Sequence, residues 1–531
     1  MQSIYLIAGL SVAWLTLCIV MWRLHRSRLY SKPKADVSTL IAYASQTGNA
    51  QTIAKRCAAA LNLSETTSVI ALNALTLAHL RQIENILFVV STYGDGEAPD
   101  NGALFTKLTK TLSSDTSERL NHLSYSIIAL GDSAYPKFCA FGHQINQTML
   151  DAGAQSQGEV ITVDNYHEQT TELANITPDW VTIDHELTLN PAIKSLQYWQ
   201  LTKRELLNPG CSNENLLQLN FKSIGPSPTW KAGDLIDIQP QQPTDIVDQW
   251  LLENKFDGNT WVTYQGHQQY LKEWLLTRDL PLSCSYSLDE LLNKLPYLQQ
   301  RSYSVASISQ EGQLKLIVRL VEKKEVNYLA INQSDITFGL SSGFLGHYCQ
   351  VGSIVEGQIR EVSSHHNINP NRPKILIGAG SGLAGLKAQI AASTFSEYRP
   401  DKASECHQKS KIWLIYGERN SKPELPINQQ LLTLQETHLA KLNCAYSQVC
   451  QNDLKSTSKN NSTNKHPKYV QEILVAEQNT LQQWIEDGAV IYVCGCLSGM
   501  GESVHQALIE ILGKSAIEAL QLEQRYIRDV Y

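Results

Sequence analysis

Six short apolar segments of this 531-residue chain each run into a loop of small residues, and this pattern limits the folds open to it. The segments occupy residues 37–42, 86–90, 126–130, 373–377, 412–416 and 489–493. A buried strand that ends in a loop rich in glycine and hydroxyl side chains is typical of an open parallel sheet, which binds ligands at the carboxyl ends of its strands. The sequence therefore predicts an α/β fold of several domains, two of them built on doubly wound parallel sheets.

Length, charge and cysteine usage exclude several classes of protein. At about 150 residues per domain, the length predicts three or four domains. The chain has 44 Lys and Arg against 51 Asp and Glu, a net charge of −7. This balance argues against a nucleic acid partner, because phosphate binding needs a basic face. The 11 cysteines are odd in number and show neither a CxxC pair nor a zinc-binding spacing, so we expect no disulfide framework and no metal site.

The N-terminal segment has the composition of a membrane anchor. Residues 3–22 carry no charge and, at about 1.5 Å per residue, are long enough to cross a bilayer. Residues 23–36 then contain five basic side chains and one acidic one, which by the positive-inside rule places the rest of the chain in the cytoplasm. We therefore expect a single-pass protein of the cell membrane, with a transmembrane helix in residues 1–22 and a basic linker after it. A cleaved signal peptide fits less well, because the basic residues follow the apolar run.

The loop between the first strand and the next helix is a candidate phosphate site. Its residues are Ser45, Gln46, Thr47, Gly48, Asn49 and Ala50. Backbone N–H groups at a helix N-terminus, with hydroxyl and amide side chains beside them, can bind a phosphate monoester. The lysine of a Walker loop is missing, and the loop taken alone would equally be an ordinary capped turn.

Two later loops favour a ligand site over an ordinary turn. The first contains Ser91, Thr92, Tyr93, Gly94 and Gly96, and the second contains Leu130, Gly131, Asp132, Tyr135 and Phe138. Both follow apolar strands, and their tyrosines could sandwich a flat ring system while backbone amides meet its polar edge. Together with the phosphate loop they resemble the FMN site of a flavodoxin. This resemblance predicts a flavodoxin-like, doubly wound FMN domain over residues 37–185.

The predicted FMN domain is strongly acidic. Residues 37–184 hold 7 Lys and Arg against 15 Asp and Glu. Two explanations stay open: the charge keeps the domain soluble, or it forms an acidic face that steers a basic redox partner into place.

Residues 186–206 read as a tether, and residues 207–372 form a β-rich segment with a candidate site for a second flavin. Strand alternation places Arg301 and Tyr303 on one side of a strand. An arginine beside hydroxyl groups such as that of Ser304 can hold a pyrophosphate bidentately, while the tyrosine ring stacks on the flavin. Taken alone, this motif would also fit an ordinary edge strand.

Two further turns of small residues are candidate pyrophosphate sites. One could add N–H groups to the second flavin site through Gly339, Ser341 and Ser342. The other follows an apolar strand and contains Gly378, Gly380, Ser381 and Gly382. Glycines there allow the backbone to approach a dinucleotide closely. A plain helix cap and a simple βα turn are the respective alternatives.

The order of these motifs resembles the diflavin reductases, a family that includes NADPH–hemoprotein reductases and the sulfite reductase flavoprotein. The resemblance covers nearly the whole chain after residue 37. It implies an antiparallel β-barrel FAD domain with a helical insert, followed by a Rossmann-like NAD(P)-binding domain over residues 373–531. It also implies the cofactors FMN, FAD and NADPH.

The resemblance further implies roles for single residues. Ser304, Cys494 and Asp529 would line the site of hydride transfer. The terminal Tyr531 would cover the FAD ring and swing away to admit nicotinamide. The adenosine end of NADPH would be held by Arg419, Ser447, Lys468, Tyr469 and Gln471. The family's Ser-Arg pair ends in Gln448 here, so one guanidinium is lost and NADH is not excluded.

The implied activity is an NADPH-dependent flavoprotein reductase that passes electrons from NADPH to FAD, to FMN and then to a one-electron acceptor. Two acceptors stay open. A sulfite reductase hemoprotein is favoured by the resemblance, and a membrane heme or ferric-iron partner is favoured by the predicted anchor. A third hypothesis is a flavin-binding docking module whose altered nucleotide site is catalytically weak.

Overall fold

The chain divides into two compact units, Met1–Ile193 and Lys194–Tyr531. The computed structural model describes residues 38–45, 48–61, 63, 68–92, 96, 98–99, 101–102, 104–105, 108, 119–131, 137–164, 197–210, 215–226, 228–264, 266–281, 284–324, 336–362, 372–397, 411–448 and 467–531.

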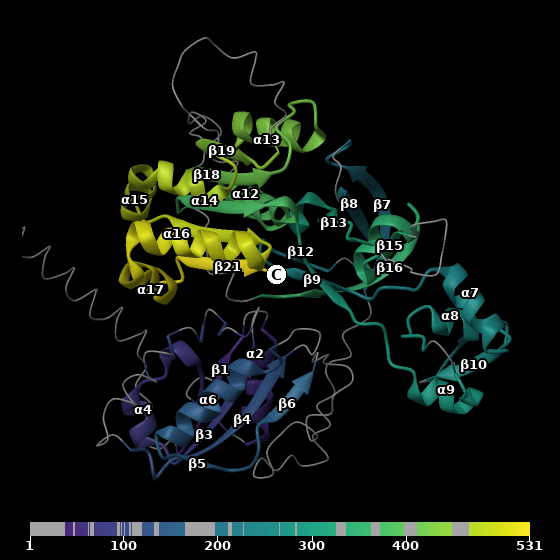
Figure 1. The fold of residues 1–531 in the computed structure, drawn as a ribbon, viewed down its shortest axis with the longest axis horizontal. Helices are drawn as coiled ribbons and strands as arrows, with labels where there is room; N and C mark the ends of the chain where they lie inside the picture. Colours follow the sequence, from purple (N-terminus) through teal and green to yellow (C-terminus); the bar gives the residue numbers. More distant parts are fainter. Residues whose placement is uncertain are drawn as a thin grey trace, which may run out of the picture. The chain divides into compact units, whose positions relative to one another are not determined.

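The first unit is a parallel sheet flanked by helices (Figure 1). Its strands are β1 (Thr39–Ala44), β2 (Val69–Ala71), β3 (Asn85–Ser91), β4 (Ser124–Gly131), β5 (Gln155–Ser156) and β6 (Ile161–Asp164). They run in the order β2-β1-β3-β4-β5, with β6 paired to β4, and these pairings are parallel. This is the flavodoxin-like strand order, so the predicted doubly wound fold is confirmed.

Both faces of this sheet are covered by helices. Alternate residues of β3 belong to separate apolar clusters: Phe88 packs with residues of α6 (Ala140–Asp151), whereas Val89 packs with residues of α2 (Asn49–Ala60). Because successive side chains of a strand point to opposite faces, α2 and α6 lie on opposite sides of the sheet. Two shorter helical segments complete the described part of the unit: η1 (Leu72–Ala74) and α4 (Leu77–Gln82).

The second unit begins with a six-stranded antiparallel sheet in the order β12-β9-β16-β7-β8-β13. The strands are β7 (Tyr198–Leu206), β8 (Leu216–Ile224), β9 (Leu235–Ile238), β12 (Arg301–Ser304), β13 (Leu314–Arg319) and β16 (Ile354–Arg360). A largely helical insert follows β9, with α7 (Thr244–Glu253), β10 (Trp261–Tyr264), β11 (His267–Tyr270), α8 (Leu271–Leu275) and α9 (Leu288–Lys294). The antiparallel pairing and the helical insert agree with the predicted FAD domain, but the described strands follow an open path from β12 to β13 and not the closed ring of the predicted barrel. β7 occupies the last nine residues of the predicted tether, which therefore ends before β7.

Shorter elements link β12 to β16. They are η3 (Ser309–Glu311), the hairpin strands β14 (Glu322–Lys324) and β15 (Ile336–Phe338), α10 (Leu340–Gly343) and η4 (Phe344–Tyr348).

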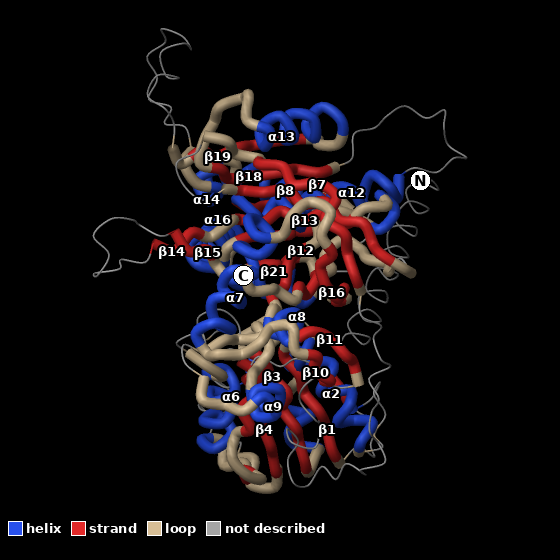
Figure 2. Tube along the Cα trace, turned by 90° about the vertical axis from the view of Figure 1, so that its right-hand side faces the viewer, coloured by secondary structure: helices blue, strands red, loops and turns tan. Residues whose placement is uncertain are grey.

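A five-stranded parallel sheet forms the C-terminal part of the second unit (Figure 2). Its strands are β17 (Lys374–Ala379), β18 (Ile412–Glu418), β19 (Lys441–Tyr446), β20 (Val490–Gly495) and β21 (Tyr526–Val530), in the order β19-β18-β17-β20-β21. The strand order reverses between β17 and β20, which is where open α/β sheets bind ligands. The segments between the strands are η5 (Gly380–Gly382), α12 (Leu383–Glu397), α13 (Pro426–Thr437), α14 (Val470–Ala476), α15 (Gln478–Glu486), η8 (Leu497–Gly501), α16 (Glu502–Leu512) and α17 (Lys514–Leu522).

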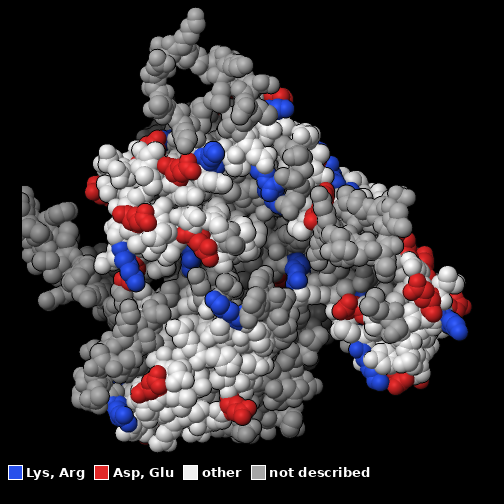
Figure 3. Space-filling model, viewed as in Figure 1, with Lys and Arg blue, Asp and Glu red and all other residues white. Residues whose placement is uncertain are grey.

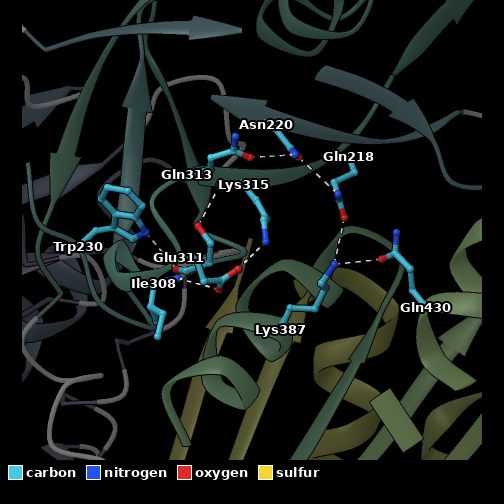
Figure 4. Close-up of polar contacts among 10 residues, drawn as sticks. Gln218, Asn220, Trp230, Ile308, Glu311, Gln313, Lys315, Lys387 and Gln430 are labelled. Carbon is cyan, nitrogen blue, oxygen red and sulfur yellow. Dashed lines mark hydrogen bonds and ion pairs between the residues drawn. The ribbon is translucent and has the colours of Figure 1, made fainter. Parts of the chain in front are cut away.

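A partly buried lysine links the antiparallel sheet of the second unit to helices of its C-terminal part. Lys387 lies on α12, and its Nζ donates hydrogen bonds of 3.0 Å each to Gln218 Oε1 on β8 and Gln430 Oε1 on α13 (Figure 4). The ion pair between Lys315 and Glu311 lies close by. Burial, together with the positive charge of Lys315, lowers the pKa of Lys387 to about 8. The amine is therefore charged at neutral pH only at a cost to the folded state.

Replacing Lys387 by methionine is expected to change how stability depends on pH. The folded chain releases the proton near pH 8 and the unfolded chain near 10.5, so the penalty of the buried charge disappears as the pH rises through this range. The free energy of unfolding of the wild type should therefore rise by up to ~3 kcal/mol relative to Lys387→Met. Urea unfolding at pH 7 and pH 10 measures this difference. The matched variant Lys294→Met, at a half-exposed lysine, should show no such divergence.

Among the described residues, no helix combines the length and the apolar composition needed to cross a membrane. The predicted transmembrane helix and basic linker, residues 1–22 and 23–36, fall outside the part of the chain that the structure describes.

Candidate functional site

The predicted phosphate loop of the first unit joins β1 to the start of α2. Gly48 precedes the helix with a left-handed φ of 89°, a conformation that favours glycine. As a glycine, this N-cap residue has no side chain that could accept a hydrogen bond from the helix. Instead, Ser45 Oγ accepts a 3.2 Å hydrogen bond from the N–H of Ala50. The first backbone N–H groups of this 12-residue helix thus lie beside the Ser45 hydroxyl, an arrangement that fits a phosphate monoester. Gln46 and Thr47 lie outside the described residues.

The other two loops of the first unit meet this one at the same edge of the sheet. Ser91 Oγ donates to the carbonyl of Ala44 at 3.2 Å, and the N–H of Thr92 donates to the carbonyl of Leu130 at 2.9 Å. The hydroxyl of Thr92 in turn accepts a hydrogen bond from the N–H of Phe141. These bonds tie the ends of β1, β3 and β4 together, as expected for parallel strands.

Close packing explains the glycine at the end of β4. A Cβ on Gly131 would lie 2.8 Å from both the backbone nitrogen of Cys139 and the ring of Phe138. Gly96, in the second loop, has a φ of 98°, and a Cβ there would lie 2.7 Å from the side chain of Lys137. At both positions a side chain larger than glycine would meet its neighbours, so these glycines allow close packing at the sheet edge. The predicted ligand residues Tyr93, Gly94, Asp132 and Tyr135 lie outside the described residues.

The predicted acidic docking face stays a prediction. On the side of the first unit seen in Figure 3, the described acidic and basic side chains are separated from one another and form no continuous patch. Several acidic residues on which the prediction rests are not among the described residues: Asp95, Glu97, Asp100 and Asp132.

In the second unit, the candidate FAD residues come from β12 and from the turn before α10. Arg301 is exposed, and burial raises the pKa of Tyr303 to about 12, so its hydroxyl stays protonated. Ser342 Oγ accepts a hydrogen bond from the N–H of Val321 and donates to the carbonyl of Gly339.

The same turn carries a second hydroxyl, that of Ser341. Ser341 is 3% exposed, and its Oγ has no partner of normal hydrogen-bond geometry among the described residues, although it lies near enough to the Tyr303 hydroxyl to lower the pKa of that group. A buried hydroxyl without a partner is costly unless a ligand satisfies it. With the exposed guanidinium of Arg301 on β12, this turn fits the pyrophosphate or ribose of a dinucleotide such as FAD.

The predicted residues of the hydride-transfer site come together around one carboxylate oxygen. Asp529 Oδ2, on β21, accepts a 2.8 Å hydrogen bond from Ser304 Oγ and lies 3.4 Å from Cys494 Sγ, which donates to it. All three residues are buried. Burial and the negative charge of Asp529 raise the pKa of Cys494 well above its usual value, so the thiol stays protonated. The cluster therefore presents an oriented carboxylate, with neutral donors, at the point where the strand order reverses.

The terminal residue, Tyr531, is held by its backbone and by its hydroxyl. The N–H of Tyr531 donates to the carbonyl of Gly495, and its own carbonyl accepts from the N–H of Leu497. The residue is 54% exposed, and its hydroxyl donates a 2.9 Å hydrogen bond to Ser381 Oγ in the glycine-rich turn. The aromatic ring therefore lies next to the turn that is predicted to receive the dinucleotide.

The glycine-rich turn packs too closely against β20 to accept side chains. A Cβ on Gly378 or Gly382 would overlap with the carbonyl oxygen of Cys494. Gly380 has a left-handed φ of 55° and accepts a hydrogen bond from Tyr416 OH through its carbonyl. These contacts hold a turn without bulky side chains at the switch point, which fits the close approach of a pyrophosphate such as that of NADPH.

The residues predicted to bind the adenosine end lie around the exits of β18 and β19. The N–H of Ser447 donates to the carbonyl of Glu418, and the N–H of Gln448 donates to the carbonyl of Arg419. The carbonyl of Pro467 accepts from the N–H of Tyr446, which brings the next segment alongside. That segment carries the remaining three candidates: the exposed Lys468, the exposed Tyr469, and Gln471 in the first turn of α14.

Sequence reasoning missed several residues of this site. Tyr492 donates a 2.9 Å hydrogen bond to Asp529 Oδ2, and strand alternation relative to Cys494 was the signal that could have found it. Gly385 packs against the same cluster. The guanidinium of Arg319 lies against Gly380, and no motif marked that arginine in advance.

Two domain models match the chain. The model described as Flavodoxin matches residues 41–176, and the one described as Oxidoreductase NAD-binding domain matches residues 376–506.

Similar curated proteins include several sulfite reductase (NADPH) flavoprotein alpha-components. The chain is 23% identical to that of Bacillus subtilis, over 94% of this chain and 90% of the relative. It is 26% identical to that of Shewanella sp. strain ANA-3, with the same two coverages. It is 24% identical to that of Vibrio cholerae strain El Tor Inaba N16961, over 96% of this chain and 92% of the relative.

These relatives correct one expectation. The predicted localisation, a single-pass protein of the cell membrane, is wrong: relatives that match over 94% of the chain are named as sulfite reductase flavoprotein components. The physical reason is that an uncharged run of about 20 residues is necessary for a membrane-spanning helix but does not by itself specify one.

The identity of the chain follows from the two domain models taken together with relatives of nearly full length. The flavodoxin-like sheet lies in the N-terminal unit and the nucleotide-binding sheet at the C-terminus, in the order that the motifs predicted. This protein belongs to the diflavin reductase family, the NADPH-dependent flavoprotein reductases that use FMN and FAD.

Proposed function

We propose that this protein carries electrons from NADPH through FAD and FMN to a hemoprotein that accepts them singly, as the flavoprotein component of a sulfite reductase. The proposal is supported by the names of its relatives. The observation that carries it is the buried cluster of Ser304, Cys494 and Asp529 at the switch point of the C-terminal sheet.

The proposed domains are an FMN domain over residues 37–185, a tether that ends before β7 instead of at residue 206, an FAD domain that begins with β7 and runs to residue 372, and an NAD(P)-binding domain over 373–531. When bound, the two flavins take up a hydride from NADPH and release its electrons one at a time. The tether would let the FMN domain alternate between FAD and the acceptor.

The proposed binding residues follow from the geometry above. The FMN phosphate would lie at the N-terminus of α2, against Ser45 and Gly48. The FAD pyrophosphate would be held by Arg301 and by the buried hydroxyl of Ser341. Gly380 and the rest of its turn would receive the pyrophosphate of NADPH.

The carboxylate of Asp529 has the charge that hydride transfer needs. As NADPH gives up a hydride, its nicotinamide ring becomes positive, and a fixed negative charge nearby favours that change. Ser304 and Cys494 hold the carboxylate in place without neutralising it, since both donate as neutral groups. Tyr531 would cover the flavin ring until nicotinamide displaces it, which requires breaking only the hydrogen bond to Ser381.

Purification of the full chain tests the proposal directly. We expect one FMN and one FAD per chain, NADPH-driven reduction of cytochrome c, and sulfite reduction when a sulfite reductase hemoprotein is added. A single flavin per chain would contradict the proposal. Reduction of cytochrome c without any support of the hemoprotein would leave the enzyme class intact but contradict the acceptor. A protein with both flavins that fails to oxidise NADPH would be a docking module.

Where the family usually has an arginine, this chain has Gln448, and placing an arginine there is expected to strengthen NADPH binding. Gln448 lies beside Arg419, and an arginine there would add a bidentate partner for the 2′-phosphate. Gln448→Arg should lower the KM for NADPH about fivefold to tenfold at low salt and leave the KM for NADH unchanged. Steady-state assays with both nucleotides measure this. An equal change for both nucleotides, or the same change in the surface variant Gln482→Arg, would contradict a specific contact.

A further inference from the structure

Tyr492 lies directly behind the hydride-transfer cluster. It is two residues before Cys494 on β20, so both side chains point to the same face of the sheet. β20 pairs in parallel with β21 in a register that places Cys494 opposite Asp529. The phenol thus reaches the carboxylate from within the sheet. Tyr492 is 1% exposed, so its ring is enclosed by the protein on this side of the cluster.

The Tyr492 hydroxyl shares its acceptor with the residues proposed to touch the reactants. Asp529 Oδ2 accepts hydrogen bonds from Tyr492 OH at 2.9 Å, Ser304 Oγ at 2.8 Å and Cys494 Sγ at 3.4 Å. Three donors around one oxygen fix the rotation of the carboxylate.

The hydroxyl of Tyr492 stays protonated, so it can donate this hydrogen bond at any physiological pH. Burial and the negative charge of Asp529 raise the pKa of Tyr492 well above its usual value. The hydroxyl therefore remains a donor over the whole physiological pH range. A hydrogen bond to a charged acceptor in a buried site is roughly twice as strong as a neutral one.

Helix α12 packs closely against the cluster and leaves no space for another side chain beside the Tyr492 hydroxyl. A Cβ on Gly385, in α12, would lie 2.8 Å from Cys494 Sγ, 3.1 Å from Asp529 Oδ2 and 3.1 Å from Tyr492 OH. The backbone of α12 therefore closes the cluster on the side of the tyrosine. The space behind the carboxylate admits a phenol hydroxyl but no additional side chain.

We propose that Tyr492 is a positioning residue for hydride transfer, which holds the carboxylate of Asp529 toward the reacting centre through a buried hydrogen bond. The inference rests on the proposed role of the Ser304, Cys494 and Asp529 cluster. It adds a residue that contacts neither reactant. Without the tyrosine hydroxyl, Asp529 can rotate between Ser304 and Cys494, and the productive orientation is populated less.

The variant Tyr492→Phe removes only the hydroxyl. In stopped-flow experiments on the flavin-loaded full chain, we expect NADPH to reduce FAD about tenfold more slowly, with the dissociation constant of NADP⁺ unchanged. The primary deuterium isotope effect with labelled NADPH should grow, because the hydride step becomes slower than the others. Tyr125→Phe is the matched control: Tyr125 is also 1% exposed, and its hydroxyl donates to Asn146 in the first unit. This control should reduce FAD at the wild-type rate.

Two further measurements separate positioning from general damage. In an Asp529→Asn background, Tyr492→Phe should cause no additional loss of rate, because the tyrosine acts through that carboxylate. In the flavin-free chain, the melting temperature of the double variant should fall by less than the sum of the two single shifts. Additive losses in both experiments would overturn the proposal.

The outcome also distinguishes this inference from the function on which it rests. If the wild type reduces FAD with NADPH and Tyr492→Phe does so at the same rate, only the role of Tyr492 is wrong. If the wild type itself does not reduce FAD, the proposed function fails, and the melting-temperature cycle still reports whether Tyr492 and Asp529 are coupled.

Discussion

Asp529→Asn is expected to slow the reduction of FAD by NADPH about 100- to 1,000-fold. The substitution keeps the shape of the side chain and removes the negative charge that favours the developing nicotinamide cation. It also removes an oxygen that accepts three hydrogen bonds. If the NH₂ group of the asparagine took the place of that oxygen, it would face the donors Ser304 and Tyr492 and could not accept their hydrogen bonds. Stopped-flow absorbance at the flavin band measures the rate directly.

The Asp529→Asn experiment needs evidence that binding survives. We expect unchanged FMN and FAD content and an NADP⁺ dissociation constant within about threefold of the wild type, since a fixed charge that acts on the transition state contributes little to ground-state binding. Asp487→Asn, at an exposed aspartate of the same domain, should reduce FAD at the wild-type rate. A loss smaller than tenfold in Asp529→Asn would contradict the proposed electrostatic role.

Gly382→Ala is expected to abolish measurable NADP⁺ binding, a loss of at least 100-fold. The added methyl group would overlap with the carbonyl group of Cys494 and lie 2.8 Å from the Cα of Gly495, and these backbone atoms cannot move aside as a flexible side chain could. The turn must shift away from β20, which moves the proposed pyrophosphate site and strains the core by about 1–3 kcal/mol. Isothermal titration with NADP⁺ measures the loss.

The matched variant for this prediction is Gly488→Ala. Gly488 has a positive φ of 86° with no atom within 4 Å of an added Cβ, so the alanine meets backbone strain but no steric overlap. We expect it to destabilise the domain by roughly 1 kcal/mol and to bind NADP⁺ as the wild type does. FMN content should be normal in both variants. If Gly382→Ala bound NADP⁺ with wild-type affinity, the assignment of this turn to the dinucleotide would be wrong.

The strand exits of both parallel sheets could be predicted because local sequence determines them. An apolar run followed by small residues marks where a strand ends, and parallel strands bring those ends to one edge without further information. For that reason the loops after β1, β3 and β4 were expected to meet, and Ser91 and Thr92 do bridge them. The family resemblance then supplied the antiparallel sheet and the helical insert, which periodicity alone did not specify.

Long-range side-chain contacts could not be predicted in the same way. Ser304 and Asp529 are 225 residues apart, and only the resemblance placed them together. The contact of Tyr492 with the cluster was not predicted, because a tyrosine in an apolar strand usually belongs to the core. The contacts of Lys387 could not be predicted, because its partners Gln218 and Gln430 lie on β8 and α13, far from it in the sequence. The localisation prediction failed for a related reason, since composition describes a segment but not its surroundings.

The hydrogen bond between Ser304 and Asp529 joins β12 of the antiparallel sheet to β21 of the C-terminal sheet. The proposed reacting centre thus combines residues from both sheets, and neither part of the chain supplies it alone. Recombination that exchanged only the last module between relatives would separate a hydroxyl from its matched carboxylate. We expect the two modules to be inherited as a block, and chimaeras intended to alter nucleotide preference should be joined ahead of β7.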